Sequence, residues 1–164
     1  MSKSVLMPHI LVVCTANICR SPVGEAVLRD RLQSQGLFDW TVASAGTWGL
    51  DGRGAAENSV TIMAEEGFDL QAHRARTITE EMLAEADLVL CMESGHVEAI
   101  KIEFPHYATK VFLFSEIINQ RYNISDPYGG PLKDYKRMAN EITKIIDSGL
   151  EKIVALASGQ IDET

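Results

Sequence analysis

His9-Ile10-Leu11-Val12-Val13-Cys14-Thr15-Ala16-Asn17-Ile18-Cys19-Arg20-Ser21-Pro22 is the stretch of sequence that decides the fold of this chain. Its first five residues predict a buried strand, because the run is short, continuous and rich in β-branched side chains. Ser21 and Pro22 predict the start of a helix, since serine is a favourable N-cap and proline suits the first helical position. The stretch therefore indicates a strand, a short polar loop and a helix in direct succession.

Apolar runs and helical periodicities alternate along the rest of the chain. Strands are predicted at 40–44, 87–92 and 110–114, and helices at 58–66, 77–85 and 96–104. The helix that starts at Ser21 has a stop signal at Gly36. A last helix is indicated by apolar side chains at three- and four-residue steps from Tyr135 to Leu156, with Gly149 as a candidate break.

Strands that alternate with helices predict an α/β fold of three layers, αβα, in which helices cover both faces of a four-stranded parallel sheet. A chain of 164 residues has the length of a single domain, so we expect residues 1–164 to form one, with a flexible tail over about residues 1–8. Ligands bind such sheets at the carboxyl ends of the strands. The loop 14–20 leaves the first strand at that edge and is the predicted phosphate-binding loop.

Composition and charge exclude several classes of protein. Lys and Arg number 15 against 23 Asp and Glu, which gives a net charge of −8 at pH 7. Binders of nucleic acid or of anionic membranes depend on clustered Lys and Arg, so neither partner is expected. The apolar run 10–13 is too short for a signal peptide or a membrane span, and the cysteine count is odd, which together favour a cytoplasmic protein. A local site must attract any anionic ligand.

The loop 14–20 has the chemistry of an oxyanion site. A tight turn from a strand into a helix points successive N–H groups inward as a nest for an anion, and the helix N-terminus adds positive potential. Arg20 can close the ring with a planar fork that matches two phosphate oxygens. The same field favours the thiolate form of Cys14. A cysteine at a strand end is commonly a small core residue, but Arg20 and Ser21 beside it favour a nucleophile.

The other two cysteines have simpler interpretations. Cys19 either packs beneath the loop or is a resolving thiol that captures oxidised Cys14 in a disulfide. The spacing of Cys14 and Cys19 is not that of a zinc ligand pair, and a cation would repel Arg20, so no metal and no cofactor is expected. Cys91 lies in an apolar run and is predicted to be a core residue.

Four separated motifs carry a resemblance that covers nearly the whole chain, from Ile10 to the last helix. They are Cys14-Thr15-Ala16-Asn17-Ile18-Cys19-Arg20-Ser21-Pro22, Ser44-Ala45-Gly46-Thr47, His73-Arg74-Ala75-Arg76 and Asp126-Pro127-Tyr128. These motifs resemble the low molecular weight protein tyrosine phosphatase family. The resemblance implies that Cys14 is the nucleophile of a protein-tyrosine phosphatase and forms a phosphocysteine intermediate. It implies further that Arg20 binds the phosphoryl oxygens, that Ser21 assists the departing thiolate and that Asp126 is the general acid.

By the same resemblance, further residues support or line the loop. Asn17, Ser44 and His73 match positions that hold its shape through hydrogen bonds. The loop residues expected to bind the substrate are Thr15, Ala16, Asn17, Ile18 and Cys19. The family usually has glycine where Ala16 stands, so we expect strain in the loop if that position requires a positive φ.

An acid at Asp126 is also supported by the chemistry of the leaving group. A phenol has a pKa near 10, so its release at neutral pH needs a proton, and a positioned donor contributes roughly 10²–10⁴-fold. Asp126 lies in the turn-rich segment 123–130, where the simpler interpretation is an Asx turn before proline. With the other motifs present, the acid is favoured. It must hold its proton when the substrate binds, so activity is expected to fall toward high pH.

Two aromatic residues, Trp48 and Tyr128, are candidate walls for a flat aromatic substrate. The simpler interpretations are core packing for Trp48 and a surface loop position for Tyr128. His9, His96 and His106 are expected to be surface or packing residues rather than ligands.

Three other functions remain open. Thiol-based arsenate reductases share this loop but resemble a three-cysteine relay, and Cys91 is the only cysteine after Cys19. Protein-arginine phosphatases resemble the chain at 126–130 but carry threonine at the position of Ile18, which as an apolar side chain favours an aromatic ring. A non-catalytic phosphate-binding module would need no cysteine. The expected partners are a phosphotyrosine protein, with a tyrosine kinase as one candidate, and phosphate or a similar oxyanion in the loop.

Overall fold

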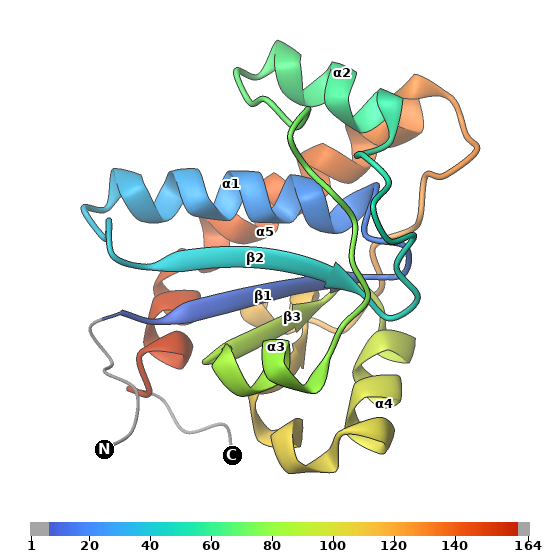
Figure 1. Ribbon diagram of the computed structural model, residues 1–164. Coiled ribbons are helices and arrows are strands. Elements are labelled where there is room, and N and C mark those ends of the chain that lie inside the picture. Colours follow the sequence, from blue (N-terminus) through green and yellow to red (C-terminus); the bar gives the residue numbers. More distant parts are fainter. Residues whose placement is uncertain (1–6, 161–164) are drawn as a thin grey trace.

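The computed structural model describes residues 7–160, and these form three layers. Helices α1 (Arg20–Ser34) and α5 (Leu132–Ala157) pack on one face of a sheet, and α3 (Glu80–Glu85) and α4 (Ser94–Glu103) pack on the other (Figure 1). The predicted αβα architecture is therefore confirmed. Of the tail expected over about residues 1–8, residues 1–6 lie outside the described residues, whereas Pro8 is buried and its carbonyl accepts from the N–H of Thr41 at 3.1 Å.

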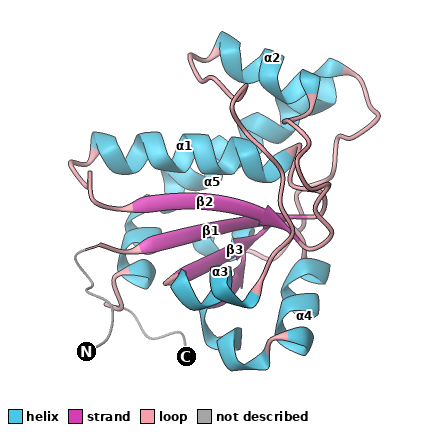
Figure 2. Ribbon diagram, in the orientation of Figure 1, coloured by secondary structure: helices cyan, strands magenta, loops and turns pink. Residues whose placement is uncertain are grey.

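The sheet has four parallel strands, as predicted, and their order is β2-β1-β3-β4. Figure 2 shows β1 between β2 and β3. The strands are β1 (His9–Cys14), β2 (Thr41–Gly46), β3 (Leu88–Cys91) and β4 (Val111–Leu113). The strand predicted at 40–44 thus continues to Gly46, and those predicted at 87–92 and 110–114 are one residue shorter at each end. The extension of β2 brings Gly46 level with Cys14, the last residue of β1.

The N-terminus of α1 differs from the prediction. The helix begins at Arg20, with Cys19 at the N-cap position and no side-chain capping bond, so Ser21 is not the cap. Its hydroxyl is engaged inside the loop instead, as described below. The predicted stop is confirmed, because Gly36 adopts φ +80° and the N–H of Leu37 bonds the carbonyl of Leu32 at 3.0 Å, which is a Schellman ending.

The other helices also differ locally from their predicted bounds. The helix predicted at 77–85 begins only at Glu80, because the side chain of Thr79 caps it by accepting from the N–H of Met82. The break expected at Gly149 was wrong, since α5 runs through it without interruption. The remaining elements are α2 (Glu57–Glu65) and the 3-10 helices η1 (Pro105–Lys110) and η2 (Phe114–Ile118). Within residues 7–160 no helix has both the length and the apolar content needed to cross a bilayer.

The sheet separates two apolar cores, one on each face. Successive side chains of a strand point to opposite faces. Ile10 and Val12 of β1 accordingly pack in the core that holds residues of α1 and α5, whereas Leu11 and Val13 pack in the core that holds residues of α3 and α4. Cys91 is fully buried in the second core, as predicted.

The strand order places β1 between β2 and β3, so the chain leaves β1 toward one side of the sheet and returns to its other side. The strands are all parallel, so their carboxyl ends meet at one edge of the sheet, where the loop after β1 and the loop before α5 also lie (Figure 1). The carboxyl edge of a parallel sheet is where such folds bind ligands, at the point where the strand order reverses.

Candidate active site

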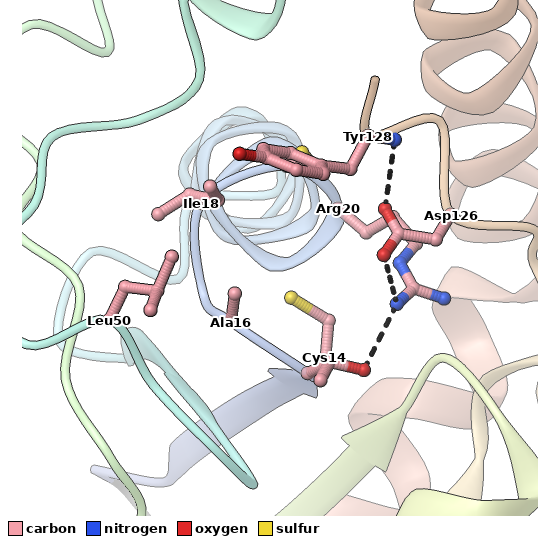
Figure 3. Close-up of a pocket in the computed structure, with 9 residues that line it drawn as sticks. Cys14, Ala16, Ile18, Arg20, Leu50, Asp126 and Tyr128 are labelled. Atoms are coloured by element: carbon pink, nitrogen blue, oxygen red, sulfur yellow. Dashed lines mark hydrogen bonds and ion pairs between the residues drawn. The ribbon is translucent and has the colours of Figure 1, made fainter. Parts of the chain in front are cut away.

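A pocket opens at the carboxyl end of β1, and its cavity volume is about 140 Å³. Its lining residues are Cys14, Thr15, Ala16, Ile18, Cys19, Arg20, Leu50, Asp126 and Tyr128. In Figure 3 the sulfur of Cys14 points into this space, with the ring of Tyr128 above it and Ile18 and Leu50 on the side opposite Arg20 and Asp126. The structure thus brings together two segments that lie more than a hundred residues apart in the sequence.

The loop after β1 is held by its carbonyl groups, which all bond outward. The carbonyl oxygens of residues 14 to 19 each accept one hydrogen bond, at 2.7 to 3.1 Å. Taken in that order, their donors are the N–H of Thr47, the N–H of Trp48, the N–H of Leu50, Nε2 of His73, the N–H of Ala56 and Oγ of Ser59. Because no described peptide bond is cis, the N–H that follows each carbonyl points the opposite way, toward the inside of the loop. This arrangement is the nest for an anion that the sequence predicts.

Arg20 lies in the loop with only 1% of its surface exposed. Its Nη1 donates to the carboxylate of Glu93 and, at 2.7 Å, to the carbonyl of Ile124. Its Nη2 donates to Oγ1 of Thr15 at 3.3 Å and lies 3.5 Å from Oδ2 of Asp126, while Nε has no hydrogen-bond partner among the described residues. The edge formed by Nε and Nη2 faces the pocket in Figure 3, and it is the edge that can bind two oxygens of one phosphate.

Ser21 lies beside the thiol of Cys14, with Oγ at 3.0 Å from Sγ. The Nδ2 of Asn17 donates to Oγ of Ser21 at 2.7 Å and to Oγ of Ser44 at 3.0 Å. The amide of Asn17 cannot be reversed, because its Oδ1 accepts from the backbone N–H of Arg76 at 3.0 Å. An amide nitrogen only donates, so the hydroxyl proton of Ser21 is left to point at the sulfur of Cys14.

Asn17, Ser44 and His73, the three residues expected to support the loop, lie together, because Ser44 and His73 both contact Asn17. Ser44 accepts from Asn17 and donates to Oε1 of Glu25 at 2.6 Å, and His73 bonds the carbonyl of Asn17 at 2.7 Å. Asn17 itself adopts φ 63°, and the only other described non-glycine residue with a positive φ is Asn119. The strain considered at Ala16 therefore does not arise, since the left-handed position is occupied by asparagine, which tolerates it better than most residues.

Gly46 explains part of the second motif. A Cβ atom at this position would lie 2.2 Å from the carbonyl oxygen of Thr15, so a side chain cannot be accommodated there without moving the loop. β2 therefore passes directly beneath the loop, and the next two N–H groups, of Thr47 and Trp48, reach the loop carbonyls.

The two expected aromatic walls have different positions. Tyr128 lines the pocket and is 61% exposed. Trp48 is 79% exposed, so it does not pack in the core, and it is absent from the lining residues. Leu50, two residues further along the same segment, lines the pocket in its place.

Sequence reasoning missed Glu93 and His96, at the start of α4, and the carbonyl of Ile124. The signal that could have found the first two is their place directly after β3, at the same carboxyl edge as the loop. His96 is buried and its Nε2 lies 2.8 Å from Oγ1 of Thr15, so it is a packing residue, as expected, that also contacts the loop. Burial, with the nearby Arg20 cation, lowers the pKa of His96 to about 4.

Cys14 and Cys19 are both free thiols. Cys19 is buried, lines the pocket and lies with Sγ 3.7 Å from Oη of Tyr135. Burial raises the pKa of the Cys19 thiol to about 11. Cys19 therefore remains a protonated thiol at neutral pH.

Comparisons with known proteins agree with this geometry. The family model described as low molecular weight phosphotyrosine protein phosphatase matches residues 9–157. The "Probable low molecular weight protein-tyrosine-phosphatase EpsP" of Ralstonia nicotianae is 35% identical over 151 residues, which are 92% of this chain and 99% of that protein. The "Protein-arginine-phosphatase" of Geobacillus stearothermophilus is also 35% identical, over 149 residues, 90% of this chain and 97% of that protein.

A solved structure shows the same fold. The crystal structure of the low molecular weight protein tyrosine phosphatase from T. tengcongensis has a TM-score of 0.84 and 38% sequence identity, and the match covers 88% of this chain and 99% of that one. Fold, pocket and sequence thus lead to one conclusion: the chain is a phosphatase that belongs to the low molecular weight phosphotyrosine protein phosphatase family.

Proposed function

We propose that this phosphatase hydrolyses phosphotyrosine in proteins through a phosphocysteine intermediate on Cys14. The observation that carries the proposal is the Nε of Arg20, which is buried and has no hydrogen-bond partner among residues 7–160. A buried donor without an acceptor is costly, so an acceptor is expected in the functional state. Nε, Nη2 and the inward N–H groups of the loop are donors that a phosphoryl dianion above Cys14 satisfies together.

The first step transfers the phosphoryl group to the enzyme. The sulfur of Cys14 attacks phosphorus, the bond from phosphorus to the phenolic oxygen breaks, and the proton of Asp126 passes to that oxygen. The side chain of Asp126 is 44% exposed and reaches the pocket from the loop before α5, where a leaving group would lie. The step needs Asp126 in its protonated form, because the leaving oxygen takes its proton from that carboxyl group.

The second step releases phosphate. A water molecule attacks phosphorus, its proton passes to the carboxylate of Asp126, and the bond between phosphorus and sulfur breaks. The sulfur leaves as a thiolate. The hydroxyl of Ser21, whose proton Asn17 directs toward the sulfur, stabilises that thiolate with a hydrogen bond.

The walls of the pocket support an aromatic substrate. Ile18 and Leu50 provide apolar surface, and Tyr128 provides a ring. A phosphoarginine side chain carries several N–H donors, and neither Ile18 nor Leu50 offers an acceptor for them, so it would leave donors unpaired. Because one relative is a protein-arginine-phosphatase, phosphoarginine is the second candidate substrate, and the experiment must compare it with phosphotyrosine.

The thiol relay of an arsenate reductase is not supported. It requires further cysteines that can reach the first one. Cys91 is fully buried in the core on the face of α3 and α4 and is not among the residues that line the pocket.

The test is a panel of peptides of one sequence that carry phosphotyrosine, phosphoarginine or phosphoserine. We expect kcat/KM to be highest for phosphotyrosine. Preference for phosphoarginine would overturn the assigned substrate, and the absence of any turnover would favour a phosphate-binding module. Cys14→Ser is expected to lose turnover by about 10³-fold or more, with Cys91→Ala as the matched control that retains it. Turnover that survives in Cys14→Ala, which has no nucleophile at this position, would exclude the covalent mechanism.

A further inference from the structure

Thr15 and His96 form a contact that neither step of the proposed reaction uses. Thr15 belongs to the loop after β1, and His96 lies in the first turn of α4, 81 residues later. Oγ1 of Thr15 and Nε2 of His96 are 2.8 Å apart. Thr15 lines the pocket, and His96 is 5% exposed and lies behind it.

The direction of this hydrogen bond follows from the other side of the imidazole ring. Nδ1 of His96 accepts from the backbone N–H of Glu93 at 3.1 Å, as part of the capping box of α4. A ring nitrogen that accepts carries no proton, so in the neutral ring the proton is on Nε2. The low pKa of His96, about 4, keeps the ring neutral at pH 7. His96 therefore donates to the hydroxyl oxygen of Thr15.

The same hydroxyl oxygen also accepts from Nη2 of Arg20 at 3.3 Å. The other terminal nitrogen of Arg20, Nη1, donates to the carboxylate of Glu93. The first residues of α4 thus reach both ends of the guanidinium, Glu93 directly and His96 through Thr15. This pair of contacts leaves Nε and the remaining proton of Nη2 directed at the pocket.

We propose that His96 is a positioning residue that holds Nη2 of Arg20 in its phosphate-binding direction through the hydroxyl of Thr15. The inference rests on the proposed role of Arg20. The alternative partner of Nη2 is the carboxylate of Asp126, only 3.5 Å away. Without an oriented hydroxyl at Thr15, Nη2 turns toward Asp126, and that ion pair takes Nη2 away from the phosphoryl group.

A double-mutant cycle tests this chain of contacts. His96→Asn replaces Nδ1 by an amide oxygen that still accepts from the N–H of Glu93, but its shorter side chain removes the donor to Thr15. Thr15→Val removes the hydroxyl with little change of shape. Each single variant is expected to lower kcat/KM for an aryl phosphate by about three- to tenfold, and to weaken the affinity for inorganic phosphate by a similar factor.

The double variant gives the decisive result. Because His96 acts only through the hydroxyl, His96→Asn is expected to have no further effect in the Thr15→Val background and its full effect in the Thr15→Ser background. An equal effect of His96→Asn in all backgrounds would overturn the proposal, as would an unchanged phosphate affinity in His96→Asn. Thermal unfolding of each variant separates a loss of folding from a loss of positioning.

Phosphate affinity is measured by titration calorimetry, which does not depend on turnover. The cycle therefore gives a result even if the native chain hydrolyses no phosphotyrosine. If the substrate assignment is wrong, the effects of the variants on phosphate affinity can still be measured and compared. If the effects of His96→Asn and Thr15→Val on phosphate affinity are additive while the native chain hydrolyses phosphotyrosine as proposed, only the role of His96 is contradicted.

Discussion

Asp126 makes two contacts that belong to different interpretations of the same residue. Its Oδ1 accepts from the N–H of Tyr128 at 3.1 Å, which is the Asx turn expected of an aspartate before proline. Its Oδ2 lies 3.5 Å from Nη2 of Arg20, on the same side of the pocket (Figure 3). The turn and the proposed acid are therefore not alternatives, because the turn fixes the direction from which the carboxyl group meets a leaving group.

Asp126→Asn separates the two contacts. Asparagine still accepts from the N–H of Tyr128 but donates no proton to a phenolate, so turnover is expected to fall by roughly 10²–10⁴-fold for a poor leaving group. The loss should shrink as the leaving phenol becomes more acidic, and kcat for a series of aryl phosphates measures it. Asp69→Asn is the control, since Asp69 forms a similar turn with the N–H of Gln71 and does not line this pocket. Equal losses across the series would exclude Asp126 as the acid.

The buried ring of His96 links the stability of the fold to pH. Its pKa in the folded protein is about 4, below the ordinary value of 6.5, because burial and the Arg20 cation oppose protonation, although Glu93 and Asp126 partly offset them. As the pH falls from 6.5 to 4, the unfolded chain takes up a proton that the folded chain does not, so the free energy of unfolding declines over this window.

Urea unfolding measured from about pH 7 to about pH 4.5 checks this decline. The free energy of unfolding is expected to change less steeply with pH in His96→Asn than in the native protein, because the variant has no ring to protonate. The carboxylates are common to the two proteins and do not contribute to this difference. Parallel curves for the two proteins would show that His96 does not carry the effect.

At the scale of single residues, the sequence predicts which side chains take part in the site when those residues are close together in one motif. Cys14 and Arg20 line the pocket, and Ser21 lies beside the thiol of Cys14, because all three belong to one short stretch of chain. Glu93 escaped prediction because its partner Arg20 lies 73 residues away and nothing in the local sequence marks the pairing. The choice between Trp48 and Leu50 depends on the path of an irregular segment, which neighbouring residues do not determine.

At the scale of elements, α5 shows why local propensity is an incomplete guide. Glycine lowers helix propensity, and Gly149 is therefore a natural place to expect a break. The helix continues because η2 packs against it at this point, and a Cβ on Gly149 would lie 2.2 Å from Cγ2 of Ile117. The close contact with Ile117 requires a residue without a side chain at position 149, and the 26-residue helix tolerates the low helix propensity of that glycine.

Gly149→Ala is expected to destabilise the protein despite the better helix propensity of alanine. The new methyl group must displace Ile117, which costs about 1–3 kcal/mol of unfolding free energy, more than the gain of about 1 kcal/mol from propensity. Chemical denaturation measures the difference. Ser148→Ala, on the exposed side of the same turn, is the control and is expected to stay within about 0.5 kcal/mol of the native chain. A stabilised Gly149→Ala would show that η2 yields without cost.

Helix and strand types follow from periodicity, whereas their ends depend on contacts that the sequence does not display. The start of α1 illustrates this. Serine is a favourable N-cap residue, but the hydroxyl of Ser21 forms hydrogen bonds with Cys14 and Asn17 instead. The end of β2 is a second case. Its last residue, Gly46, is set by the approach of the loop carbonyl of Thr15 rather than by strand propensity.

At the scale of the whole molecule, a net charge of −8 surrounds a pocket built for an anion. The attraction comes from Arg20 and the loop N–H groups, which act at short range, while the overall field repels acidic substrates. The αβα architecture that carries this site was predictable, because its strands and helices alternate in the sequence, whereas the order of the strands in the sheet was not.

A rise in ionic strength is therefore expected to change the KM of acidic peptides and the KM of basic peptides in opposite directions. Screening shortens from about 30 Å at 0.01 M salt to about 8 Å at 0.15 M. Over that range we expect KM to fall several-fold for a phosphotyrosine peptide with acidic flanks and to rise for one with basic flanks, with kcat nearly constant. Steady-state kinetics on the two peptides measures this, and a small aryl phosphate with no charge other than its phosphoryl group is the control. The same response from both peptides would contradict long-range repulsion.

The pocket and its supports come from six segments, 14–21, 44–50, 56–59, 73–76, 93–96 and 124–128, joined by the hydrogen bonds described above. None of them forms the oxyanion nest alone, because the outward carbonyls of the first segment need donors from the second, third and fourth. Distant pairings of this kind close late when a chain refolds. After dilution from denaturant, helical circular dichroism is expected to recover before phosphatase activity, so the return of activity reports the last step of folding.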